Sequence, residues 1–100
     1  MTAKHVEIAN RAYRLRYSVN ALCEIEARAG GSLDHLMEKQ FSATRLLLWG
    51  ALTECQPEIT LRDAGDIITE HLQNGGTLEE IVDLCADALG EAGFFERPAV

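Results

Sequence analysis

The chain has 100 residues, 47% of them hydrophobic and 25% charged, which suits one domain with one modest core rather than a disordered chain. Sixteen acidic residues against nine basic ones give a net charge of −7, and residues 51–100 hold eleven of the acids. Such a balance repels nucleic-acid phosphates. No apolar run is long enough to cross a bilayer, and no secretory signal opens the chain. We therefore expect one intracellular domain, residues 1–100, that binds neither nucleic acid nor membrane.

Residues 4–17 have the period-two alternation of a β-hairpin, with a turn near Asn10–Arg11 because asparagine tolerates positive φ. The apolar positions are Val6, Ile8, Tyr13, Leu15 and Tyr17. Arg14 and Arg16 fall on the opposite face. Since an isolated hairpin is marginally stable in water, we expect its apolar face to pack on the helices that follow.

Residues 18–93 predict a bundle of four to five short helices, which makes the fold class mainly α (α+β). Ser18 is a suitable N-cap for a helix over 19–29 that Gly30–Gly31 ends. The apolar stripe expected on this helix is Val19, Leu22, Cys23, Ile25 and Ala29. Ser32 can cap a short helix that ends near Lys39.

A more hydrophobic helix is expected to start at Ser42 or Thr44, to include Trp49 and Cys55, and to end at Pro57. Its apolar residues lie on most sides, so it should be the central, buried helix. Two further helices begin with capping-box patterns at Thr60 and Thr77. A tail over residues 94–100 follows.

Catalytic and metal-binding patterns are missing from the sequence. His5, His35 and His71 fall in different elements, and the three cysteines have no zinc-ligand spacing. We interpret Cys23, Cys55 and Cys85 as reduced, buried hydrophobic residues. We therefore expect no enzyme activity and no cofactor.

Two other small helical classes fit less well. Gly31-Ser32-Leu33 is similar to the modified Asp-Ser-Leu of acyl carrier proteins, but a glycine replaces the aspartate and a hairpin is foreign to that fold. A DNA-binding helix-turn-helix across Gly75–Gly76 would present an acidic recognition helix, which the phosphates would repel. An acyl-carrier-like protein stays a remote alternative.

Three stretches carry a resemblance to a known family: YRLRYSVNALCE (13–24), ATRLLLW (43–49) and CADALGEAGFF (85–95). Together they resemble the small tail proteins encoded in gene transfer agents and siphophage-like prophages of alphaproteobacteria, between the tail tube gene and the tape-measure gene. The resemblance implies a tail assembly chaperone, although the family is sometimes labelled as a tail tube protein. Such a chaperone coats the helical tape-measure protein in the bacterial cytoplasm and helps tail tube subunits to polymerise around it.

The expected partners are therefore the tape-measure protein and the tail tube protein, and a homo-oligomer stays open. The alternative is a structural, virion-associated tail component, either a tail tube or a tail completion protein. Candidate partner-binding residues follow from physical reasoning alone. Arg14 and Arg16 could contact an anion or a carboxylate, and Phe94 and Phe95 either fold back over the core or form an exposed apolar anchor.

Overall fold

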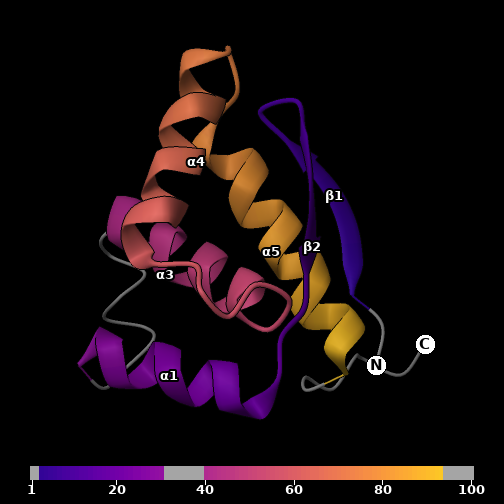
Figure 1. The fold of residues 1–100 in the computed structure, drawn as a ribbon, viewed down its shortest axis with the longest axis vertical. Coiled ribbons are helices and arrows are strands. Elements are labelled where there is room, and N and C mark those ends of the chain that lie inside the picture. Colours follow the sequence, from indigo (N-terminus) through magenta and orange to yellow (C-terminus); the bar gives the residue numbers. More distant parts are fainter. Residues whose placement is uncertain (1–2, 31–39, 94–100) are drawn as a thin grey trace.

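The structure, a computed structural model, describes residues 3–30 and 40–93. Its elements are β1 (Lys4–Ile8), β2 (Arg11–Leu15), α1 (Val19–Ala29), α3 (Gln40–Thr53), α4 (Leu61–Gln73) and α5 (Leu78–Ala92). An antiparallel hairpin thus precedes four helices in the described ranges, which confirms the mainly α class with an N-terminal hairpin (Figure 1). The short helix predicted after Ser32 and the tail 94–100 lie outside the described residues.

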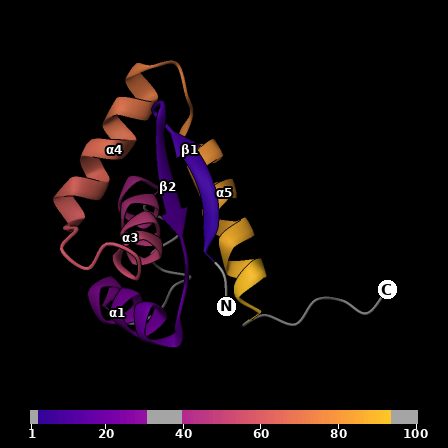
Figure 2. The same ribbon diagram turned by 45° about the vertical axis from the view of Figure 1, so that its right-hand side comes forward.

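Helix α3 occupies the centre of the fold, as its hydrophobic sequence predicted. It packs against α1, α4, α5 and β2, while β1 packs against α5 (Figures 1 and 2). Its buried residues are Ala43, Thr44, Leu46, Leu48, Trp49, Gly50, Ala51 and Leu52. A helix surrounded on most sides needs apolar residues all round, which explains why it shows no single stripe.

The hairpin turn lies one residue earlier than predicted. Ala9 and Asn10 take positive φ values of 53° and 66°, and Arg11 already pairs with Ile8. Two consecutive positive φ values make a two-residue turn whose twist matches the strands it joins. The prediction placed the turn at Asn10–Arg11 because nothing in the sequence marks an alanine for this conformation.

One face of the hairpin contributes to the core, as expected. Ile8 and Leu15 are 1% exposed and belong to the same apolar cluster as Ile81 and Cys85 of α5. The opposite face is exposed; its residues are His5, Glu7, Ala12 and Arg14. The two strands therefore form a half-covered layer, with one face packed against α3 and α5 and the other in contact with solvent.

Helix α1 starts and stops where predicted but buries a different stripe. The Ser18 hydroxyl accepts a hydrogen bond from the amide of Ala21 at 3.0 Å, and Gly30 ends the helix at a φ of 78°. However, Val19 is 62% exposed and Cys23 is also exposed, so their predicted burial is wrong. The helix instead buries the side that carries Ala21 and Ile25, because Ile25 packs against Gly50 of α3.

Helix α3 begins at Gln40, earlier than the predicted Ser42 or Thr44, and ends at Thr53, before Cys55. The Thr44 hydroxyl donates a hydrogen bond to the carbonyl oxygen of Gln40 at 2.7 Å. The hydroxyl of Thr44 is thus bonded to a carbonyl one turn earlier in the same helix. Thr44 lies inside the helix and is not its N-cap.

Both predicted capping boxes are confirmed. Thr60 caps α4 together with Asp63, and Thr77 caps α5 together with Glu80. In each case the threonine hydroxyl accepts from the third amide of the helix, and the carboxylate accepts from the threonine amide. These short-range hydrogen bonds fix the residue at which α4 and α5 each begin. They therefore help to set which side of each helix carries its acidic residues.

Candidate functional site

The described part of the chain holds no group of three or more His, Cys, Asp or Glu side chains placed to bind a metal ion. His5 is exposed on β1, and His35 lies outside the described residues. His71 Nε2 lies 3.2 Å from Glu80 Oε1, which joins the end of α4 to the start of α5. The Thr77 amide, and then His71, lower the pKa of Glu80. This pair has a clear structural role.

The cysteines differ in their surroundings, and the prediction that all three are buried is wrong. Cys85 is 1% exposed, Cys55 is half-buried and Cys23 is exposed. Burial raises the pKa of Cys85 to about 11. The pKa of Tyr17 is also raised well above its ordinary value, mainly by burial and then by the neighbouring Cys85. Since the thiolate is the reactive form, Cys85 is an inert core residue.

The two candidate arginines lie in one segment but in different environments. Arg14 is exposed on the outer face of the hairpin, opposite His5. Arg16 follows β2, and its backbone amide donates to the carbonyl of Ala51 at 2.9 Å. Its Nε is buried without a hydrogen-bond partner among the described residues. Phe94 and Phe95 lie outside the described residues.

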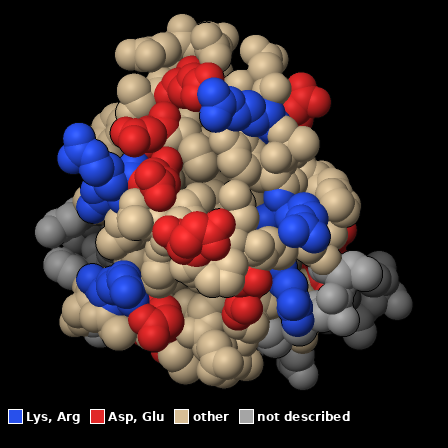
Figure 3. Space-filling view, viewed as in Figure 1, with Lys and Arg blue, Asp and Glu red and all other residues tan. Residues whose placement is uncertain are grey.

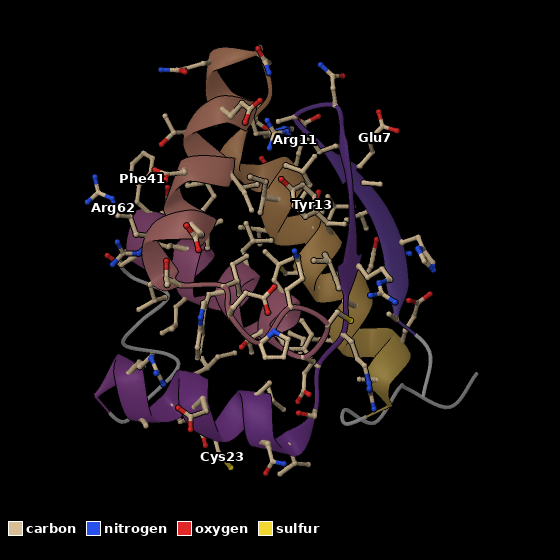
Figure 4. All side chains as sticks on the ribbon, viewed as in Figure 1. Glu7, Arg11, Tyr13, Cys23, Phe41 and Arg62 are labelled. Carbon is tan, nitrogen blue, oxygen red and sulfur yellow. The ribbon has the colours of Figure 1, made fainter. Side chains whose placement is uncertain are left out.

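A hollow of about 360 Å³ separates the hairpin from α4. We call it the α4–β2 groove; it is lined by Arg11, Tyr13, Gln56, Glu58, Ile59, Asp63, Asp66, Ile67 and Glu70. Tyr13 and Arg11 reach it from β2 (Figure 4). Figure 3 shows several acidic side chains on the face that carries α4. The groove combines half-buried apolar side chains with carboxylates, an arrangement suited to binding protein rather than to chemistry.

A second uneven surface surrounds the start of α3. Phe41 is 69% exposed there and points away from the core (Figure 4). Phe41 lines a hollow of about 300 Å³ toward Gly65 and Leu72 of α4. Another hollow of about 300 Å³ lies between the start of α3 and Leu78 and Val82 of α5. The residues that precede Gln40 lie outside the described part of the chain.

The sequence did not point to the α4–β2 groove. Asp63, Asp66 and Glu70 could be recognised as one polar stripe of a helix from their spacing. However, their partner wall comes from residues some fifty positions earlier in the chain, and only the packing of the complete fold brings the two walls together.

Comparison with protein-family models, with curated proteins and with solved structures finds no match to this chain. Among the described helices, none is both long enough and apolar enough to pass through a membrane.

Proposed function

We propose that the chain is a phage-type tail assembly chaperone, which binds the tape-measure protein and assists assembly of the tail tube around it without catalysis. The proposal starts from the resemblance of residues 13–24, 43–49 and 85–95 to the small tail proteins of gene transfer agents. The observation that carries it furthest is the α4–β2 groove, which offers half-buried apolar side chains and carboxylates on one open surface. A chaperone for a long helical protein needs such a surface in order to cover apolar helical stripes.

The described fold also favours the chaperone over the structural alternative. A tail tube component is expected to contribute extended sheet to a ring, whereas the described residues contain one two-stranded hairpin beside helices. In the proposed role the protein acts in the bacterial cytoplasm during particle assembly and leaves before the particle is finished. Its partners are the tape-measure and tail tube proteins, with neither nucleic acid nor membrane involved.

Co-expression with a tape-measure protein of a gene transfer agent of this type tests this function. We expect the tape-measure protein to become soluble and to co-purify in a fixed ratio with this chain. An unrelated acidic helical protein of similar size is the control, because acidity alone can raise solubility. Failure to associate, together with ring formation or retention in finished particles, would identify a structural tail component instead.

A further inference from the structure

We propose that the α4–β2 groove is the docking site for a partner helix whose apolar stripe is flanked by lysine or arginine residues. The inference rests on the proposed function where it takes the tape-measure protein as the source of that helix.

The groove is lined by two elements and by part of the connection between α3 and α4, which contributes Gln56, Glu58 and Ile59. Helix α4 forms one side, and the exposed end of β2 near the hairpin turn forms the other (Figure 4). Tyr13 of β2, Ile67 of α4 and Ile59 of the connection before α4 are half-buried, so each keeps some apolar surface in contact with water. A partner that brings apolar side chains to these three residues removes that surface from water on both molecules.

The acids along the groove are arranged in a row. Asp63, Asp66 and Glu70 are spaced i, i+3 and i+7, so they share one side of α4 over about 10 Å of helix. Glu58 extends the row before the helix begins. A partner helix that runs beside α4 repeats its side chains with the same period and can set a cation against each carboxylate in turn.

Most of this negative charge has no neutralising partner within the described part of the chain. Asp63 accepts a hydrogen bond from the Thr60 amide, but Asp66 and Glu70 take part in no ion pair there. Arg11 lines the same groove and, among the described residues, makes no ion pair with any of its acids. Four acids and one arginine leave the groove with a charge of −3.

This charge selects the occupant. A cationic helix gains from each carboxylate and approaches faster because of the field, whereas an anionic partner is repelled. The row of acids follows a helical period, and the apolar residues lie beside it, so a helix with lysines or arginines next to an apolar stripe matches both features.

The test uses a 20-residue amphipathic peptide of leucine and lysine as the probe, with a leucine–glutamate peptide as its control. Backbone amide shifts in NMR titrations report where the lysine peptide binds, and we expect the largest shifts around Tyr13, Asp66 and Ile67. The double variant Asp66→Lys/Glu70→Lys should raise the Kd at least about tenfold, since it places like charges opposite each other.

The matched control is Asp83→Lys/Asp87→Lys on the exposed side of α5, which has the same i, i+4 spacing and the same change in net charge. It should raise the Kd by less than about threefold, the size expected of a long-range charge effect. If the charge reversal in the groove prevents folding, Asp66→Asn/Glu70→Gln provides the same comparison with a smaller change.

Equal losses in the two lysine variants, shifts centred on Phe41, or equal binding of the glutamate peptide would each overturn the groove proposal. Co-purification of the tape-measure protein tests the proposed function independently of peptide binding. If the tape-measure protein co-purifies equally with the wild type and with the groove variant, the chaperone stands and the groove is wrong. If the lysine peptide binds in the groove but the tape-measure protein does not co-purify, the groove stands and the chaperone is wrong.

Discussion

Single residues in this fold are distinguished mainly by what covers them. Cys23 and Cys85 are chemically identical, yet Cys23 faces solvent on α1 whereas Cys85 lies in the core beside Tyr17. The Tyr17 hydroxyl donates to the carbonyl of Leu47 at 2.6 Å, so its polar group is satisfied although the side chain is fully buried. The sequence could not separate the two cysteines, because both follow apolar helical patterns.

We expect thiol labelling to separate them. In the native protein Cys23 should react rapidly with iodoacetamide at pH 8, whereas Cys85 should react only through unfolding, since its pKa of about 11 and its burial suppress the exposed thiolate. Mass spectrometry of digested peptides after timed labelling measures both rates. Comparable rates for the two thiols below the denaturation midpoint would show that the core around Tyr17 opens more readily than the structure implies.

At the scale of elements, the boundaries set by local chemistry were predictable and those set by packing were not. The capping boxes at Thr60 and Thr77 lie within four residues of sequence, so both helix starts could be read directly. The buried side of α1 depends instead on its contact with α3, some twenty-five residues away in sequence. The hairpin turn was displaced by one residue because Ala9 adopts a conformation that its side chain does not favour.

The crossing of α1 and α3 depends on a glycine. A Cβ atom at Gly50 would lie 2.4 Å from Ile25 Cδ1, and Ile25 is fully buried, so it has little room to move. We expect Gly50→Ala to lower the free energy of unfolding by about 1–3 kcal/mol through overpacking. Ile25→Val in the same chain removes the clashing methyl group and should recover part of this loss. Urea denaturation of the single and double variants measures both effects.

Gly65 of α4 is the control for that experiment. It is also inside a helix, but the atom nearest to a Cβ added there would be Arg45 Cδ at 3.3 Å, on a flexible, exposed side chain. Gly65→Ala should therefore be neutral or stabilise by up to about 1 kcal/mol, because alanine has the higher helix propensity. A loss at Gly65 as large as that at Gly50 would mean that the α1–α3 crossing is not the cause.

For the whole molecule, the sequence predicted the class and the central helix but not the candidate site. The hydrophobicity of residues 46–52 was enough to place α3 in the middle. The α4–β2 groove required knowing that the hairpin lies next to α4, and this follows from how both pack around α3 rather than from any motif. The spacing of Arg14 and Arg16 predicts one shared face, yet Arg14 is exposed and Arg16 is partly buried.

Amide hydrogen exchange should show the same organisation. Helix α3 contacts α1, α4, α5 and β2, so its central amides can open only when the whole fold does. We expect the amides of Leu48 and Leu52 to exchange at the rate of global unfolding, and those of the exposed strand residues Ala12 and Arg14 to exchange far faster. Slowest exchange in α5 rather than α3 would place the stable core elsewhere.

The packing of β1 on α5 also has a consequence for biosynthesis. The hairpin is synthesised before α5, but β1 rests on that helix, which ends at Ala92, so about 77 more residues must be made after Leu15 before the cover of β1 is complete. At about 5–20 residues per second, translation leaves Ile8 of β1 without this cover for roughly 4–15 s. A protein proposed to shield the apolar stripes of another chain thus passes through an interval in which its own β1 strand lacks the helix that covers it, and ribosome-associated factors could bind that strand.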